Sequence, residues 1–204
     1  MARRVFPAAE RKTRVNPPRT KAGLRQEITA VLGKISPAVR AAESIDLCDR
    51  LEPQLRSAHA ILFYAPLRDE LDVWPLLEKS LAAGKVCALP FFDSTTQTYS
   101  ARQVKNLTTD IVTGKFGVRE PAAGCPPMAL NELHLVLVPG MAFDLKGRRL
   151  GRGLGFYDRL LGEISGIKCG VCLDFQIVEQ LPVEPHDVNV GFLATPNRCI
   201  SIRR

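Results

Sequence analysis

The feature that most constrains the fold is a short apolar run, LHLVLV at residues 133–138, which Pro139 and Gly140 end abruptly. An apolar run of this length between turn residues is typical of a strand buried in a parallel sheet. Residues 60–64 and 86–89 form two similar runs, and a helical pattern at residues 73–83 separates them. This order of strand, helix and strand predicts a right-handed crossover between parallel strands. The chain is therefore expected to have an α/β fold.

The flanking segments complete the expected domain. Thr20 is placed to cap a first helix, and Ser36 followed by Pro37 starts a second, which should cover the sheet and stop before Pro53. Pro90 should end the strand at residues 86–89. Further expected elements are an exposed or edge strand at 98–104, a turn-rich segment at 114–121 that could carry a loop over the site, a helix at 156–164 and strands at 167–173 and 197–202.

The chain has 204 residues, of which 46% are hydrophobic, enough for one sizeable core. We therefore predict a single three-layer α/β/α domain with a mainly parallel, Rossmann-like sheet over residues 21–204. No apolar run approaches the roughly 20 residues of a membrane helix. A cytoplasmic monomer is the expectation.

Positive charge is concentrated at the start of the chain. Residues 1–20 contain six arginine or lysine residues and one glutamate, a net +5 of the total +7, so the remainder carries only +2. This segment is rich in proline and poor in apolar residues, and we interpret it as a flexible, solvated basic arm. A targeting segment and an RNA-binding arm are the alternatives, and no nucleic-acid partner is expected.

The six cysteines are scattered along the chain, which favours reduced structural thiols over a disulfide framework. Cys169 and Cys172 form a CxxC pair, but both lie in a predicted strand, where residues three apart point to opposite faces. A shared metal site or a redox pair is therefore disfavoured there.

The segment after the central strand carries the chemistry. Residues 139–161 read PGMAFDLKGRRLGRGLGFYDRLL, in which glycines alternate with arginines ahead of a predicted helix. Glycines let backbone amides approach an anion, and arginines supply forked donors. The segment lacks the P-loop pattern and only half matches the dinucleotide fingerprint. Glycine spacing alone fits a tight connection as well as an anion-binding loop, and the four arginines favour the anion.

The PGMAFD and GRRLGRGLGFYDR motifs resemble the signature of the 5-formyltetrahydrofolate cyclo-ligase family. Supporting similarities are KAGLR at residues 21–25, ELD at 70–72, Gln176, and LPVEPHD at 181–187, so the resemblance covers residues 21 to about 195. The chain departs from the family pattern at Leu154, at Phe156 in place of the first tyrosine of YYD, and at Pro196 after Thr195. The change at Phe156 removes one hydroxyl, which matters only if that hydroxyl contacts substrate.

The resemblance implies that ATP and Mg²⁺ drive cyclisation of 5-formyltetrahydrofolate to 5,10-methenyltetrahydrofolate, with release of ADP and phosphate. ATP would phosphorylate the formyl oxygen, and N10 of the folate would then attack. The implied catalytic residues are Arg149, Arg152 and Tyr157, and the implied Mg²⁺ ligands are Asp158 and Asp187. The implied nucleotide-binding residues are Lys21, Arg25, Arg149, Leu150, Gly151, Arg152, Gly153, Leu154, Gly155, Phe156 and Tyr157. The implied folate-binding residues are Leu67, Glu70, Asp72, Arg152, Gly153, Leu154, Gly155 and Phe156.

Taken without the resemblance, several of these residues have structural interpretations. Lys21 and Arg25 could form a solvated helix face, and Asp72 could cap a helix. Trp74 could belong to the core or stack on a ligand ring, and Asp158 could be a cap or an ion-pair partner. Two alternative functions also stay open: an enzyme of another class that binds a phosphate ligand on a similar scaffold, and an RNA-binding protein that uses the basic arm.

Overall fold

A large, mainly parallel sheet organises the molecule. The computed structural model describes residues 20–114, 117–153, 156–184 and 187–202. Within them the largest sheet has eight strands, in the order β13-β12-β10-β7-β1-β2-β3-β6. The five strands from β12 to β2 are parallel to one another, and β13, β3 and β6 are antiparallel additions at the two edges. The predicted α/β class and mainly parallel sheet are confirmed.

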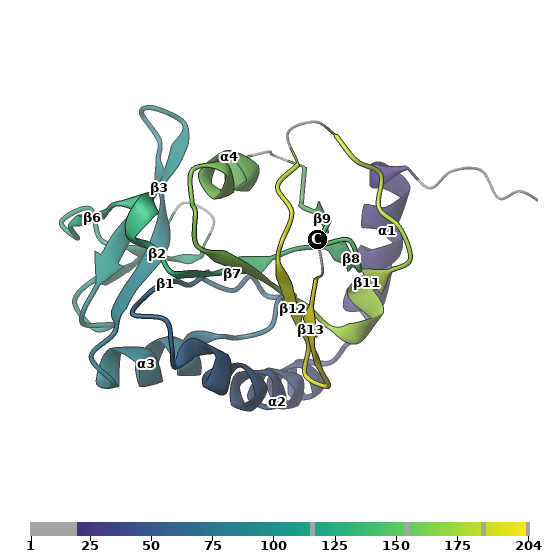
Figure 1. Ribbon diagram of the computed structural model, residues 1–204, viewed down its shortest axis with the longest axis horizontal. Coiled ribbons are helices and arrows are strands. Elements are labelled where there is room, and N and C mark those ends of the chain that lie inside the picture. The colour runs from purple at the N-terminus through teal and green to yellow at the C-terminus, as the bar shows by residue number, and fades with distance from the viewer. Residues whose placement is uncertain (1–19, 115–116, 154–155, 185–186, 203–204) are drawn as a thin grey trace, which may run out of the picture.

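The strands of this sheet are β1 (Ala60–Leu62), β2 (Val86–Asp93), β3 (Thr98–Val104), β6 (Pro127–Met128), β7 (Leu135–Pro139), β10 (Ile167–Val171), β12 (Phe192–Ala194) and β13 (Cys199–Ser201). The helices are α1 (Lys21–Leu32), α2 (Pro37–Leu55), α3 (Trp74–Ala82) and α4 (Phe156–Gly162), with 3-10 turns η1 (Leu130–Glu132) and η2 (Asp174–Gln176). Figure 1 shows α2 and α3 along one face of the sheet and α4 on the other, which makes three layers.

Two small sheets flank the large one. One joins β11 (Ile177–Val178), β8 (Ala142–Asp144) and β9 (Arg149–Leu150), and it lies beside α1 in Figure 1. The other is a hairpin of β4 (Ile111–Thr113) and β5 (Arg119–Pro121). The glycine- and arginine-rich segment is therefore not one continuous loop, because its middle pairs as the β8–β9 hairpin.

The central strand β7 is buried on both faces, as its apolar run predicts. Leu135 and Leu137 belong to the cluster that packs under α2 and α3, and Val136 and Val138 belong to the cluster under α4. Full burial of such a side chain stabilises the fold by roughly 1.5–3 kcal/mol. Because side chains on both faces of β7 are buried, the strand cannot shift along the sheet without exposing them. The position of its carboxyl end is therefore fixed.

Side-chain caps fix the starts of the first two helices. Thr20 Oγ1 accepts a hydrogen bond from the Gly23 amide at 3.1 Å, and Ser36 Oγ accepts one from the Val39 amide at 3.3 Å. The predicted caps are both present. Since α1 begins at Lys21, Lys21 and Arg25 lie one turn apart on the same side of the helix.

Two predicted element ends at proline are wrong. Helix α2 continues past Pro53 to Leu55, because burial of Leu51 and Leu55 in the core offsets the one hydrogen bond that proline cannot donate. Strand β2 continues past Pro90 to Asp93, because its pairing with β1 ends at Ala88 and only β3 pairs with it beyond that point. A missing amide is tolerated where a strand has a free side.

Other predictions need smaller corrections. Strand β3 is not the outermost strand, because β6 pairs with it at Ala101 and Arg102. Cys169 and Cys172 lie in the clusters on opposite faces of the sheet, as predicted, and both are free thiols. Within the described ranges, no helix is long and apolar enough to cross a membrane. The basic arm lies outside the described residues, except for Thr20.

Candidate active site

A cavity of about 460 Å³ opens at the carboxyl ends of β1 and β7. The chain runs outward from these two neighbours in opposite directions, from β1 to β2 on one side and from β7 to β10 on the other. Such a reversal of strand order leaves a crevice, and ligands of open α/β sheets bind there. The walls come from α1, the segment after β1, the β4–β5 hairpin, residues 149–153 and α4.

Lys21 joins the first helix to the late acidic segment. Its Nζ lies 2.8 Å from Oδ2 of Asp187 and 3.1 Å from Oε2 of Glu184. Burial alone would lower the pKa of the Lys21 ammonium, but its hydrogen bonds to Asp187 and Glu184 raise the pKa above its usual value. Lys21 is thus a charged, anchored group at the cavity wall and not a solvated helix residue.

Arg25, one turn further along α1, holds the glycine-rich segment. Its Nε donates to the Gly151 carbonyl at 2.9 Å. Gly153 has φ +103, a conformation that favours glycine, and a Cβ there would approach the Arg25 guanidinium to 3.4 Å. Gly153 is thus favoured by its backbone conformation, and the hydrogen bond from Arg25 ties the segment to α1.

Arg149 forms the most buried ion pair of the cavity. Its guanidinium lies 2.5 Å from Oδ1 of Asp158, and only 4% of its side chain is exposed. It also donates to the Pro139 carbonyl at 3.2 Å, although its Nε has no partner among the described residues. The Tyr157 ring lies 5.5 Å from this guanidinium, and within the described ranges the buried Tyr157 hydroxyl has no hydrogen-bond partner. Burial raises the pKa of Tyr157, which keeps the hydroxyl a proton donor at neutral pH.

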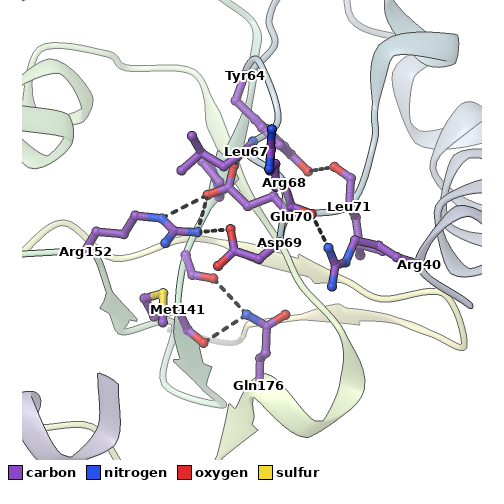
Figure 2. Close-up of polar contacts among 12 residues, drawn as sticks. Arg40, Tyr64, Leu67, Arg68, Asp69, Glu70, Leu71, Met141, Arg152 and Gln176 are labelled. Carbon is purple, nitrogen blue, oxygen red and sulfur yellow. Dashed lines mark hydrogen bonds and ion pairs between the residues drawn. The ribbon is translucent and has the colours of Figure 1, made fainter. Parts of the chain in front are cut away.

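Arg152 bridges the glycine-rich segment to the loop after β1 (Figure 2). It lies 2.6 Å from Oδ1 of Asp69 and 3.3 Å from Oε1 of Glu70. The other Glu70 oxygen accepts from the Leu67 amide at 3.0 Å. Burial raises the pKa of Glu70, even though the amide bond and the charge of Arg152 act to lower it. Glu70 is thus an acceptor held in a low-dielectric pocket.

Arg40 supports this loop from behind. Its guanidinium donates to the Arg68 carbonyl, as Figure 2 shows, and to the carbonyls of Leu32 and Ile35, each at 3.2 Å. One α2 side chain therefore ties the loop that carries Glu70 to the end of α1.

Gln176 supports the turn after β7 in the same way. Its Nε2 donates to the Gly140 carbonyl at 3.0 Å and to the Met141 carbonyl at 2.9 Å (Figure 2). Its Oε1 accepts from the Leu173 amide at 2.8 Å. A buried amide that satisfies three backbone groups fixes the Pro-Gly turn at the cavity floor.

Asp72 lies just before α3, whose N-cap position is occupied by Val73. Its Oδ1 accepts from the Trp74 amide at 2.9 Å, at the start of α3. Trp74 is buried in the core beneath the Arg119 guanidinium, which lies 3.6 Å from the ring centroid. Neither Asp72 nor Trp74 lies in the cavity wall, whereas Arg119 does.

The remaining predicted residues converge on the one cavity. It is lined by Lys21, Arg25, Leu67, Glu70, Arg149, Leu150, Gly151, Arg152, Gly153, Tyr157, Asp158 and Asp187. Leu154 and Gly155 lie outside the described residues. Phe156 is the first residue of α4, and its side chain is not described.

Comparison with known proteins shows to which family this chain belongs. A model of the 5-formyltetrahydrofolate cyclo-ligase family matches residues 18–196. The chain belongs to this family. A 5-formyltetrahydrofolate cyclo-ligase from Mycolicibacterium smegmatis is 32% identical over 188 residues, 90% of this chain and 97% of that protein. One from Escherichia coli is 32% identical over 154 residues, 72% of this chain and 82% of that protein.

A solved structure agrees. The NMR structure of Aquifex aeolicus 5,10-methenyltetrahydrofolate synthetase matches with a TM-score of 0.81 at 31% identity, over 90% of this chain and 93% of that one. The resemblance seen in the motifs and the expected fold are both confirmed, and the chain is a cyclo-ligase family member with the fold of a methenyltetrahydrofolate synthetase.

Sequence reasoning missed several residues of this cyclo-ligase cavity: Tyr64, Pro90, Tyr99, Val118, Arg119, Glu120 and Glu184. Tyr64 ends the first apolar run, so its place at a strand end was a usable signal. Asp69 was also missed, although it lies within the acidic stretch RDELD. Arg119 lies in the turn-rich segment at 114–121, which was expected to reach over the site and does line the cavity, although no residue of it was singled out. Tyr99 had no local signal, because the β3 strand reaches the cavity only through tertiary packing.

Proposed function

We propose that this cyclo-ligase family member converts 5-formyltetrahydrofolate to 5,10-methenyltetrahydrofolate, with ATP as the phosphoryl donor and ADP and phosphate as products. The observation that carries the proposal is the convergence of the family motifs on one cavity at the strand-order reversal. Folate and ATP are the proposed small-molecule substrates. A formamide is a poor electrophile, so the reaction needs activation of its oxygen.

The proposed chemistry has two steps. The formyl oxygen attacks the γ-phosphorus of ATP, and the bond from that phosphorus to ADP breaks. N10 of the folate then attacks the activated formyl carbon and loses its proton to phosphate or solvent, and the carbon–oxygen bond breaks as phosphate departs. Both steps depend on positioning and on charge neutralisation more than on a catalytic base.

The cations of the cavity suit the nucleotide. Lys21 and Arg25 on α1 would bind its phosphates, and Arg149 and Arg152 would neutralise charge on the transferring group. The buried, unpartnered Tyr157 hydroxyl supports a donor role toward a phosphate or formyl oxygen. These cations already contact acids or backbone carbonyls. On binding, the ATP phosphates would therefore replace some of these contacts.

Asp158 and Asp187 are the proposed Mg²⁺ ligands. Both line the cavity, and two carboxylates with phosphate oxygens are a donor set that suits Mg²⁺. Mg²⁺ would supply charge neutralisation of the polyphosphate. Each carboxylate is also held by a cation, Arg149 or Lys21, which fixes its orientation at the wall.

Leu67 and Glu70 are the proposed folate contacts. The buried Glu70 carboxylate is suited to accept hydrogen bonds from pterin amino and ring NH groups. Asp72 was expected to share this role, but its contact with the α3 amide and its absence from the cavity wall support a capping role instead.

The decisive experiment mixes the purified protein with 5-formyltetrahydrofolate, Mg²⁺ and ATP and follows methenyltetrahydrofolate by its near-ultraviolet absorbance. We expect product only when ATP is present. An Asp158→Asn variant should lower turnover and raise the Mg²⁺ concentration needed for half-maximal rate. A protein that makes no ATP-dependent product would sink the proposal, and wild-type Mg²⁺ dependence in the variant would reject Asp158 as a ligand.

A further inference from the structure

Arg119 differs from the deeper cavity cations in its exposure and its contacts. It lies at the start of β5, and 45% of its side chain is exposed, against 16% for Lys21 and 4% for Arg149. Arg152 is similarly exposed, at 40%, but it is already paired with Asp69 and Glu70. It therefore marks the rim of the cavity, whereas Lys21 and Arg149 lie deeper.

The guanidinium of Arg119 is held in place, but among the described residues it donates no side-chain hydrogen bond. It stacks on Trp74 at 3.6 Å from the ring centroid, and Trp74 is itself fixed in the core. The nearest Asp72 oxygen lies 3.9 Å away, too far for a hydrogen bond. Stacking fixes the plane of the guanidinium and leaves its edge available for a planar anion.

We infer that Arg119 binds the glutamate carboxylate of the folate substrate and so acts as a specificity-determining residue for the substrate's tail. The inference rests on the proposed function. A folate has a flat pterin at one end, an aromatic aminobenzoyl group in the middle and one or more charged glutamates at the other. The charged end must lie toward solvent, and the rim arginine offers the forked geometry that a carboxylate accepts.

The walls of the cavity fit this orientation. Glu70, with 14% of its side chain exposed, provides the polar acceptor at the inner end. Pro90, Tyr99 and Val118 come from β2, β3 and the β4–β5 hairpin, and they line the cavity together with Arg119. Their apolar surfaces suit an aromatic ring between the two polar ends.

Glu120 is the nearest acid along β5 and also contributes to the wall. Its carboxylate lies against Gly114 across the hairpin, where a Cβ would come within 2.1 Å of it. Successive residues of a strand point to opposite faces, so the Glu120 carboxylate is directed away from the edge that Arg119 presents.

The test compares three substrates: 5-formyltetrahydrofolate with one glutamate, the same compound with several glutamates, and 5-formyltetrahydropteroate, which has none. In Arg119→Ala we expect KM to rise roughly threefold to tenfold for the glutamylated substrates, the range for a partly exposed charge-assisted contact. The kcat and the KM for the pteroate compound and for ATP should stay at wild-type values. Arg119→Lys should recover part of the loss, because it keeps the charge but not the fork.

Two further variants sharpen the result. Arg102 also stacks on a ring, that of Phe91 at 4.0 Å, but does not line the cavity, so Arg102→Ala should lower thermal stability without raising KM. Asp72→Asn keeps a capping side chain and removes the competing charge, so the KM for glutamylated substrates should fall. A rise in KM for all three substrates would instead make Asp72 a direct folate contact.

The outcomes separate this inference from the proposed function. Equal losses on all three substrates in Arg119→Ala would assign Arg119 a structural role, and unchanged kinetics would place the tail elsewhere. Either result overturns the inference while wild-type turnover stands. If the wild-type protein turns over none of the substrates, the proposed function fails first.

Discussion

At the scale of single residues, the cavity combines side chains whose polar groups are satisfied with one whose hydroxyl is not. Tyr64 and Tyr157 both line it. The Tyr64 hydroxyl donates to the Leu71 carbonyl at 2.7 Å, whereas the buried Tyr157 hydroxyl has no partner in the part of the chain that the structure describes. A buried polar group without a partner costs stability, and such a group in a cavity is suited to a ligand.

This contrast predicts opposite effects for two matched variants. Tyr157→Phe should lower kcat/KM by about tenfold to a hundredfold, the value of a hydrogen bond to a charged group, without lowering the melting temperature. Tyr64→Phe should lose about 1 kcal/mol of stability and keep more of its activity. Thermal melts and steady-state kinetics of both variants test this, and a destabilised Tyr157→Phe protein would contradict the unpartnered hydroxyl.

Glu70 predicts a pH dependence of stability. Burial raises its pKa in the folded state above the unfolded value, so its contribution is most favourable below the unfolded pKa and is lost as pH rises through the folded pKa. The Glu70→Gln side chain does not ionise, so the variant does not lose this free energy of unfolding as pH rises. Urea denaturation between about pH 4 and about pH 8 should therefore show the variant gaining stability relative to wild type as pH rises. A relative gain toward acid pH would have the wrong sign.

At the scale of elements, the β8–β9 hairpin aims Arg149 at the cavity. Its turn needs Gly147, which has φ +79 and lies so close to Val190 that a Cβ would come within 2.3 Å of the Val190 carbonyl oxygen. The buried Asp144 completes the turn by accepting hydrogen bonds from the amides of Lys146 and Arg148. The position of Arg149, the first residue of β9, thus depends on the turn at residues 144–148 that precedes it.

Gly147→Ala should therefore destabilise the protein by about 1–3 kcal/mol and lower kcat/KM, because backbone strain and the clash would shift β9. Gly124→Ala is the matched control, since Gly124 has no positive φ and a Cβ added there would meet no atom within 4 Å. Its stability should stay within about 0.5 kcal/mol of wild type. Equal effects in the two variants, measured by urea denaturation, would argue against a special role for the turn.

At the scale of the whole molecule, the site joins distant parts of the chain. Lys21 and Asp187 are 166 positions apart, and their ion pair links the first helix to the late acidic segment. The family match begins at residue 18, so most of the basic arm precedes it. The chemistry is thus expected to reside in the folded domain and not in the arm.

Removal of residues 1–19 should leave kcat/KM unchanged and keep Thr20 as the cap of α1. An RNA-binding role for the arm would instead appear as salt-dependent binding to RNA that the truncated protein loses. Kinetics and binding assays on the full-length and truncated proteins separate the two. A large loss of turnover on truncation would show that the arm contributes to the site, and gel filtration of both proteins tests the expected monomer.

The sequence alone determined the elements with strong local signals. The apolar run ending at Pro139, the caps at Thr20 and Ser36, and the motif at residues 139–161 each depend on neighbours in the chain. They were enough to predict the α/β class and to show the resemblance to the family, and it was this resemblance that implied most of the cavity residues. Predictions failed at Pro53 and Pro90, because the burial of Leu55 and the free side of β2 are decided by tertiary contacts and not by the local sequence.

Only the tertiary structure decided which charges meet. The pairing of Arg152 with Asp69, the separation of Asp72 from the cavity wall and the place of Arg119 at the rim all depend on segments that approach through folding. The physical reason is that periodicity reports which face of an element is apolar, whereas electrostatic contacts depend on distances between elements. The sequence thus determined the scaffold and the chemistry it carries, and the packing of loops and hairpin around the carboxyl ends of β1 and β7 decided how that chemistry is arranged.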